Sequence, residues 1–378
     1  MAAVAVAVSV PGCSGPSDPN TAPDPPAVSG RTWYVGPSGA DGGPGTRERP
    51  WRTLGGSVPR LRAGDRLLLL PGTHGARGTT TDVEAGGRPG APVVIAGAPG
   101  APRPRVLGHV KVSADHVRLY GILFEGPTGQ VKSRTPGNPK GEQVQIAVEG
   151  DDVSIERSTV RGSRWHAGIF LSEAENARVL SNCILDNGDR DPKVLPLQAN
   201  QSHGIYWDSG SGIVASNLIA WNVARGVQLY RYPHDVEVVN NTIVWNGRAG
   251  IQFAASTESS LARWNILAFN GQTGVRSSSL AGPRNRATEN LAWANGRGDF
   301  EDESNELELS GNRVADPRFV DPKQDLRLAD ESPAIDRLNA PSSSPVDVAG
   351  VPRPQGKASD LGAHERAAGE ASPSTLVC

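Results

Sequence analysis

Aromatic and sulfur-containing side chains are scarce in this chain. Of 378 residues, 5% are aromatic, one is Met and three are Cys. A core must therefore be built mostly from Val, Ile, Leu and Ala. The cysteines, Cys13, Cys183 and Cys378, indicate no disulfide framework, and Cys183 is expected to be a small buried residue. No His/Cys cluster has the spacing of a zinc site.

Net charge and long apolar segments are lacking too. The formal net charge of −2 excludes an overall basic nucleic-acid binder, so no nucleic-acid partner is expected. Beyond the first ten residues, no apolar run is long enough to span a membrane. The 45 Gly and 31 Pro imply many turns, but they are spread through a periodic chain and do not indicate general disorder.

The chain does contain a repeat. Five segments carry Asn-x₄-Asn, and their first asparagines, Asn182, Asn217, Asn241, Asn265 and Asn290, are 35, 24, 24 and 25 residues apart. Each unit also contains a Gly followed by Ile or Val, as in Gly226-Val227. Apolar and polar residues alternate with a period of 2, which predicts strands. Units of this length must stack to bury their apolar faces. The predicted fold is an all-β, right-handed parallel β-helix with coils of about 24 residues, a shape whose long surface suits a polymer.

Both ends of the repeat region carry motifs. Residues 33–39 read WYVGPSG, residues 316–322 read DPRFVDP, residues 332–336 read SPAID and residues 360–365 read DLGAHE. Together these segments resemble the opening and closing motifs of secreted bacterial β-helix proteins of the pectate-lyase-like superfamily. The resemblance covers about Trp33 to Glu365. It implies a short helix over residues 54–61 that caps the open end of the solenoid, and it leaves the reaction open, because this fold hosts lyases, hydrolases, epimerases and non-enzymes.

The N-terminus predicts export. Residues 1–10 are apolar and end in Val10-Pro11-Gly12-Cys13, which resembles a bacterial lipoprotein signal with Cys13 as the lipidation site. We therefore expect an extracytoplasmic protein, secreted or lipid-anchored, whose only membrane contact is that anchor, and a monomer. The expected division is a signal or lipobox-like segment at 1–13, a flexible tether at 14–31, the β-helix at 32–315, a closing segment at 316–366 and a disordered tail at 367–378.

Side chains that alternate outward along one strand of each coil form columns. The predicted outward columns include Phe170, Tyr206, Gln228, Gln252 and Arg276 in one line, and Asp208 and Tyr230 in the next. Insertions at residues 126–142 and 188–201 both precede this strand and should flank it as a wall, often the binding face of a solenoid. The repeat asparagines, by contrast, are expected to be structural.

The candidate site lies beside the second insertion. The catalytic candidates are His203, Tyr206, Asp208 and Arg225. The substrate-binding candidates are Trp165, His166, Lys193, Gln228, Tyr230, Arg231 and His234. Arg225 or Arg231 would neutralise a substrate carboxylate, and Tyr206 or His203 would carry a proton. This set suits β-elimination on a uronate-containing polysaccharide.

Alternatives remain open. A glycoside hydrolase needs two outward carboxylates, and Asp208 has no obvious acidic neighbour in the adjacent outward columns, which favours the lyase. A uronate epimerase would use nearly the same residues, and a non-catalytic cell-surface glycan binder or adhesin is the alternative of another class. Asp189 and Asp191 form a weak calcium signal, so Ca²⁺ is the one cofactor considered.

Overall fold

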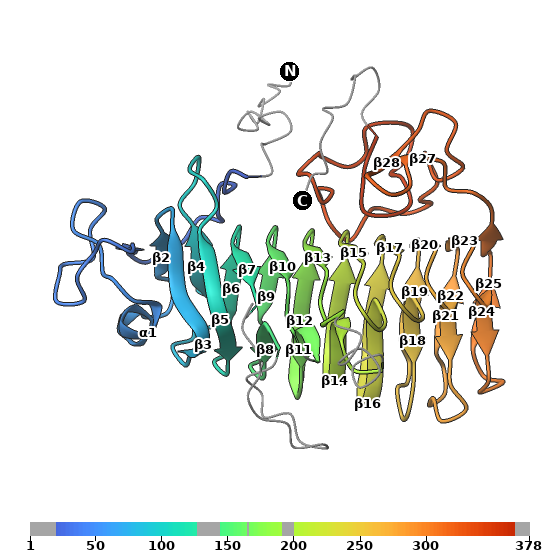
Figure 1. Ribbon diagram of the computed structural model, residues 1–378, viewed down its shortest axis with the longest axis horizontal. Coiled ribbons are helices and arrows are strands. Elements are labelled where there is room, and N and C mark those ends of the chain that lie inside the picture. The colour runs from blue at the N-terminus through green and yellow to red at the C-terminus, as the bar shows by residue number, and fades with distance from the viewer. Residues whose placement is uncertain (1–19, 127–143, 165, 191–199, 367–378) are drawn as a thin grey trace, which may run out of the picture.

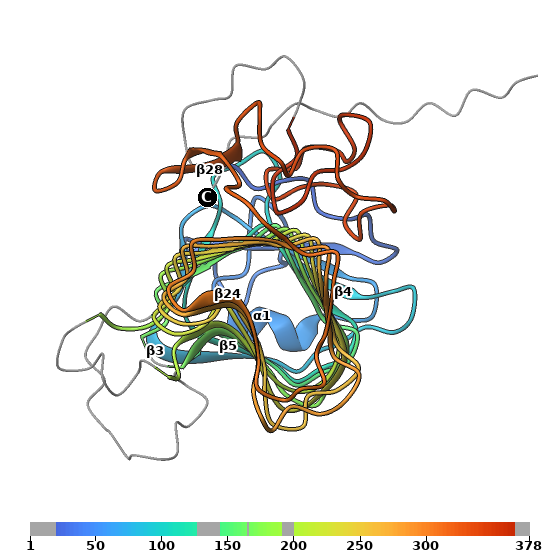
Figure 2. The same ribbon diagram turned by 90° about the vertical axis from the view of Figure 1, so that its right-hand side faces the viewer.

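The protein is a parallel solenoid. The structure, a computed structural model, describes residues 20–126, 144–164, 166–190 and 200–366. Its described strands include 26 that join in one continuous stack, which Figure 1 shows from the side and Figure 2 along its axis. Each coil contributes strands to three parallel ladders, which we call faces I, II and III. The predicted right-handed β-helix is confirmed.

Face I is the ladder that begins at the N-terminus. Its strands are, in order, β1 (Thr32–Val35), β2 (Arg66–Leu69), β4 (Val93–Gly97), β6 (Val117–Tyr120), β9 (Ser154–Glu156), β12 (Ala174–Leu180), the second parts of β14 (His203–Ala215) and β16 (Val227–Val239), β19 (Leu261–Arg263), β22 (Arg286–Thr288) and β25 (Glu308–Ser310).

Face II lies between the two asparagines of each repeat. It comprises the first parts of β3 (Thr73–Val83) and β5 (Arg105–Val112), then β7 (Leu123–Glu125), β10 (Thr159–Arg161), β13 (Cys183–Leu185), β15 (Leu218–Ala220), β17 (Thr242–Val244), β20 (Ile266–Ala268), β23 (Leu291–Trp293) and β26 (Arg313–Val314).

Face III follows the repeat glycines. It comprises the second parts of β3 and β5, then β8 (Ile146–Val148), β11 (Ala167–Leu171), the first parts of β14 and β16, β18 (Ile251–Phe253), β21 (Thr273–Ser277) and β24 (Gly298–Asp302). The predicted inward ladder of Ile169, Ile205, Val227, Ile251 and Val275 is in register and fully buried.

The repeat asparagines form two buried ladders, at the two corners that flank face II. In one, the Nδ2 of Asn217 donates to Asn241 Oδ1 at 2.9 Å, and the contact recurs from coil to coil. In the other, Asn222 donates to Asn246 at 2.9 Å in the same way. The left-handed backbone lies on the residue before each asparagine, such as Ser216 with φ 57°, rather than on the asparagine itself. The structural role predicted for these residues is thus confirmed, with the turn displaced by one position.

The repeat glycines are required because neighbouring coils approach each other closely at these positions. A Cβ on Gly226 would lie 2.4 Å from Ile243 Cγ2 and 2.7 Å from the carbonyl oxygen of Gly250 in the next coil. Any side chain would therefore push two coils apart.

The N-terminal end carries the expected short helix. Helix α1 (Leu54–Ser57) and the 3₁₀ turn η1 (Val58–Arg60) cover the bore of the solenoid, as Figure 2 shows for α1. The described part of the predicted tether, residues 20–31, is packed against the body: Ala22 is buried, its N–H donates to Ala101 O at 2.8 Å, and Gly30 N donates to Gly64 O at 2.8 Å. The ordered chain thus begins at least twelve residues earlier than the sequence motifs indicate.

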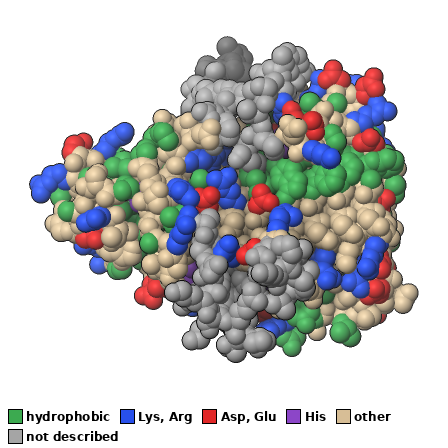
Figure 3. All heavy atoms as spheres, in the orientation of Figure 1, with side chains coloured by type: hydrophobic (Ala, Val, Ile, Leu, Met, Phe, Trp, Pro, Cys, Tyr) green, Lys and Arg blue, Asp and Glu red, His purple; other side chains and the backbone are tan. Residues whose placement is uncertain are grey.

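The closing segment, residues 316–366, lies along the side of the solenoid and not over its end (Figures 1 and 2). It contains the antiparallel pair β27 (Phe319–Asp321) and β28 (Asp325–Leu328). Its apolar residues pack on the outward side of face II, and Asn240 Nδ2 donates to Gly362 O at 2.7 Å. An apolar band follows this contact in Figure 3. Face II is therefore largely occupied by the chain itself.

Cys183 departs partly from expectation. Its side chain is buried on face II, as predicted, but it is disulfide-bonded, and its partner lies outside the described residues. Nothing in the spacing of three cysteines indicated this bond.

Candidate functional site

The candidate site is built on face III by three neighbouring strands, β11, β14 and β16. Alternation turns Ile205 and Trp207 into the core and leaves Tyr206 outside, stacked between Phe170 and Gln228 of the adjacent coils. The outward column predicted from the sequence is therefore present.

A bulge in β16 changes what stands next to Asp208. The register shifts between Trp207 and Ser209, which pair with Leu229 and Tyr232, so β16 carries one more residue than β14 here. Arg231 sits at this bulge with φ 82°. The bulge therefore interrupts the predicted column of Asp208 and Tyr230 and brings Arg231 Nε to 3.3 Å from Asp208 Oδ1.

Aromatic rings surround Tyr206. The Tyr206 ring stacks on Phe170 at 5.3 Å between centroids and on His203 at 5.5 Å, and it meets His166 edge-on at 5.0 Å. Tyr230 lies 6.2 Å away and is 43% exposed. Such a set presents flat apolar rings with polar edges, a surface on which sugar rings can stack.

Both histidines of this cluster are neutral. Burial lowers the pKa of His166 to about 4, and burial together with the charge of Arg225 holds the pKa of His203 well below its usual value. The backbone N–H of Arg225 donates to His203 Nδ1 at 3.3 Å, so that nitrogen carries no proton and Nε2 does. His166 has φ 75°, a strained backbone for a bulky residue.

Tyr206 and Asp208 form a coupled pair. The Tyr206 hydroxyl donates to Asp208 Oδ1 at 3.4 Å, and Asp208 Oδ1 lies 3.3 Å from Arg231 Nε. Burial raises the pKa of Tyr206, and the Asp208 charge adds to this, so the phenol keeps its proton. Burial also raises the pKa of Asp208, which Arg231 and Tyr206 partly offset.

Glu173 is the acidic neighbour of Asp208 that the sequence columns did not reveal. Its charge contributes to the raised pKa of Asp208, and its backbone N–H donates to Ser209 Oγ at 2.7 Å. Glu173 follows β11 in a left-handed turn, φ 58°, outside the alternating strand. Glu173 therefore lies outside the adjacent outward columns, in which the sequence showed no acidic residue.

Arg225 lies across the outer surface of the same face. Its Nε donates to Gln252 Oε1 and its Nη1 to Asn200 Oδ1, the latter at 2.7 Å. It is 6% exposed, and among the described residues it forms no ion pair. Gln228, in the Tyr206 column, is 3% exposed, and its Oε1 has no hydrogen-bond partner in the described part of the chain.

Other predicted residues lie elsewhere or cannot be placed. His234 contacts Glu175 and Asp235, each at 3.3 Å, rather than the Tyr206 cluster. Trp165, Lys193, Asp191 and Cys13 lie outside the described residues, as do 127–143 and 191–199 of the two insertions. The described flanks of both insertions meet at coil 159–167: Gly126 N donates to Arg161 O and Gly188 N to Ser163 O.

Of the two predicted calcium ligands, the structure describes only Asp189. Asp189 lies 3.7 Å from Arg164 Nε, and within 20–126, 144–164, 166–190 and 200–366 no three His, Cys, Asp or Glu residues are grouped to hold a metal. Asp191, the other predicted ligand, lies outside the described residues, and no chemical step is derived through a calcium ion.

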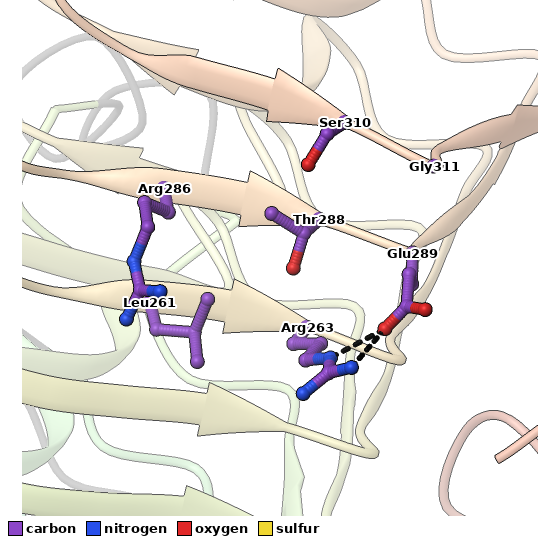
Figure 4. A pocket seen from close by; sticks show the side chains of 7 residues that line it. All are labelled: Leu261, Arg263, Arg286, Thr288, Glu289, Ser310 and Gly311. Atoms are coloured by element: carbon purple, nitrogen blue, oxygen red, sulfur yellow. Dashed lines mark hydrogen bonds and ion pairs between the residues drawn. The ribbon is translucent and has the colours of Figure 1, made fainter. Parts of the chain in front are cut away.

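A separate pocket of about 410 Å³ lies on face I. Figure 4 shows its lining on β19, β22 and β25, with Arg263 joined to Glu289 by an ion pair. Because it lies on another face from Tyr206, it is not part of the candidate site. Among the described helices, none has the length and apolar character to cross a membrane.

Comparison with known proteins supports the fold. Residues 144–314 match the family model described as "Right handed beta helix region". No curated protein matches the chain. Among solved structures, pectate lyase Pel9A is 16% identical, covering 90% of this chain and 97% of its own, with a TM-score of 0.52. A rhamnogalacturonan lyase is 13% identical over 77% and 91%, TM-score 0.52, and a glycoside hydrolase is 8% identical over 75% and 96%, TM-score 0.53.

At these identities the likeness shows the fold alone. The chain is a right-handed parallel β-helix protein with the fold of the pectate-lyase-like superfamily.

Proposed function

We propose that the protein is an extracytoplasmic, carbohydrate-active enzyme that cleaves an acidic polysaccharide by β-elimination. The observation that carries this proposal is the buried cation of Arg225, whose backbone N–H bonds the His203 ring that stacks on Tyr206. A buried guanidinium without a described acidic partner is costly unless an anion binds it, and a substrate carboxylate is such an anion.

Each residue of the site has one role in the proposed reaction. Arg225 binds the uronate carboxylate, which makes the proton on the neighbouring carbon more acidic. Asp208, a stronger base than an ordinary aspartate because of its raised pKa, takes that proton. The carbon–oxygen bond to the next sugar breaks as a carbon–carbon double bond forms. Tyr206, whose phenol stays protonated, gives its proton to the leaving oxygen. His203, a neutral Nε2–H donor, stacks on Tyr206 and orients it.

The decisive experiment is incubation with pectate, alginate and glycosaminoglycans, with and without calcium. β-Elimination gives an unsaturated product that absorbs ultraviolet light, and each cleavage gives one reducing end. Absorbance that rises together with reducing ends supports the lyase. Absence of both on every polymer would refute it.

A glycoside hydrolase is the second candidate, because Glu173 supplies the second carboxylate that such an enzyme needs. It would give reducing ends without ultraviolet absorbance, and Glu173→Gln would abolish it. The lyase assignment expects Glu173→Gln to keep most of its activity.

We also propose export and attachment through Cys13. The lipobox-like residues 10–13 motivate this proposal. Labelled palmitate should be incorporated into the wild type and not into Cys13→Ser, in a bacterial host that lipidates secreted proteins. Release of unlabelled wild type into the medium would indicate a secreted protein without an anchor.

A further inference from the structure

The last coil of the solenoid leaves core side chains uncovered. The residues that continue the core here, each given with its register partner in the preceding coil, are Phe300 with Val275, Leu309 with Ala287 and Val314 with Ala292. Parallel pairing keeps register partners on the same side of a sheet, so these residues point inward. The partners are fully buried, whereas Leu309 is 44% and Val314 60% exposed. We call this coil, residues 298–314, the open end.

The opposite end of the solenoid is closed. Helix α1 and the turn η1 cover its bore (Figure 2), whereas the closing segment lies along the side of the solenoid and does not cover the open end (Figure 1). Within the described residues, the open-end strands β24, β25 and β26 each pair on one side only. A bare last coil exposes apolar side chains and unpaired strand edges, so a partner there would bury surface that every other coil buries.

The rim of the open end is acidic. Residues 298–312 contain six Asp or Glu and no Lys or Arg. Glu301 and Glu303 pair with Arg276 of the preceding coil, but Glu306 and Glu308 are exposed and form no ion pair with another described residue. Like charges brought together across an interface repel. These carboxylates therefore disfavour a symmetric dimer in which two open ends meet.

The capped end carries the opposite charge. Residues 46–62, which form the cap and the loop before it, contain five Arg and one acidic residue, Glu48. The arginines are all exposed and form no ion pair with another described residue: Arg47, Arg49, Arg52, Arg60 and Arg62. Asp41 and Asp65 accept the backbone N–H groups of Arg52 and Arg62 and leave the guanidinium groups exposed. Figure 3 shows Lys and Arg side chains projecting at this end.

We propose that the open end docks onto the capped end of a second copy of this chain, head to tail along the solenoid axis. Opposite charges attract the two ends, and the contact covers Leu309 and Val314. Such a heterologous contact leaves one end of each kind unoccupied, so it can repeat into a linear assembly. The inference does not depend on the proposed reaction.

The contact is expected to be weak. The uncovered apolar surface is limited to side chains of one coil, and salt screens the exposed charges. The monomer expected from the sequence is then the species present in dilute solution, and association increases with protein concentration.

Two charge reversals test the contact in the full-length chain. Glu306→Arg/Glu308→Arg makes the open end basic, and Arg49→Glu/Arg52→Glu makes the cap acidic. Each variant alone then has two ends of the same sign, which repel. Mixed in equal amounts, the two variants again offer opposite charges at every contact, because the basic open end meets the acidic cap and the acidic open end meets the basic cap.

The matched control, Arg178→Glu/Lys357→Glu, reverses two exposed cations, one on face I and one on the closing segment. Sedimentation velocity is measured at rising protein concentration, at low and at moderate ionic strength, with melting curves as the folding control. We expect the wild type and the control to associate at low ionic strength and to dissociate as salt is added. Each charge-reversed variant should associate at least about tenfold more weakly, and their mixture should recover to within about threefold of wild type.

A wild type that stays monomeric at every concentration at low ionic strength would overturn the inference. Equal loss in the control, or a mixture that fails to recover, would do the same. Association that survives both reversals, as through the apolar residues 1–10, would also overturn it. Association that survives only in the cap variant would indicate a symmetric contact between open ends and refute the head-to-tail arrangement. If Glu306→Arg/Glu308→Arg misfolds, Glu306→Gln/Glu308→Gln replaces it, with an expected weakening of about threefold.

Discussion

Replacing Asn241 by Ala should destabilise the solenoid strongly, because this side chain joins three coils. Its Oδ1 accepts from the backbone N–H and the Nδ2 of Asn217, both at 2.9 Å. Its Nδ2 donates to Asn265 Oδ1 at 3.0 Å, to Val214 O at 2.8 Å and to Val239 O at 3.0 Å. Asn241 is fully buried, so water cannot replace these partners.

The magnitude follows from what is left unpaired. Removing the amide leaves the N–H of Asn217 buried with no described acceptor, at a cost of about 1–3 kcal/mol. Loss of two further net hydrogen bonds adds about 1 kcal/mol each. The expected decrease in the free energy of unfolding is therefore about 3–5 kcal/mol. At the end of the same ladder, Asn312 is half-buried and, within the described part of the chain, its side chain bonds only Asn290 and Ala287 O. Water can reach it, so Asn312→Ala should cost about 1–2 kcal/mol.

Urea unfolding followed by circular dichroism measures the decrease in the free energy of unfolding for both variants. If the solenoid unfolds in steps, the unfolding rates of the variants are compared instead. Asn241→Asp provides a further check. The carboxylate cannot donate to Val214 O and Val239 O, so this variant should be unstable at neutral pH. It should recover as pH falls, since the protonated acid can donate one bond. Equal losses at Asn241 and Asn312, or an Asn241→Asp variant as stable as wild type, would refute the role given to the ladder.

Three more outcomes are expected. Tyr206→Phe should reduce turnover on the cognate polymer by ~10²–10⁴-fold. Its melting curve should be unchanged, because only a half-buried hydroxyl is lost. Wild-type rates in both Tyr206→Phe and His203→Ala would place the catalytic site elsewhere on the solenoid. Trp207→Ala should lower stability by about 3–5 kcal/mol because the indole is fully buried in the core, which denaturation will measure against Trp207→Phe as the milder control. His364 is buried in the closing segment, and burial lowers its pKa to about 4. The wild-type protein should therefore lose stability as pH falls from 6.5 through 4, and His364→Gln should be more stable than wild type at pH 4, by up to about 3 kcal/mol. Identical pH profiles of unfolding free energy for the two proteins would contradict this.

The solenoid could be predicted from the sequence because every coil buries its apolar residues in the same pattern. The inward ladder from Ile169 to Val275 and both asparagine ladders are in the predicted register, since period-2 alternation and the Asn-x₄-Asn spacing report local geometry directly. The side on which the closing segment docks could not be predicted. Its contacts with face II join Asn240 to Gly362, which are far apart in the chain and share no periodic signal.

The candidate site could be predicted only where the strand is regular. Tyr206, Gln228 and Arg225 follow from alternation and neighbouring coils, and the structure places them on one face. Arg231 meets Asp208 through a bulge, and Glu173 reaches it from a left-handed turn, so neither contact follows from period 2. An inserted residue changes the register without changing composition, and a single sequence does not show where the insertion is absorbed.

Departures from regularity are informative in a solenoid, because the repeat shows what packing alone requires. His166 holds a bulky side chain at φ 75°, Arg231 holds another at φ 82°, and Arg225 keeps a buried cation with neutral partners. Each of these features costs stability, the strained backbones about 1–3 kcal/mol apiece, and none improves the stacking of coils. All three surround Tyr206 on adjacent coils of face III. Left-handed backbone also recurs at the corners of other coils, so the buried cation of Arg225 with neutral partners, rather than the backbone angles, is the physical reason for placing the reaction on this part of face III.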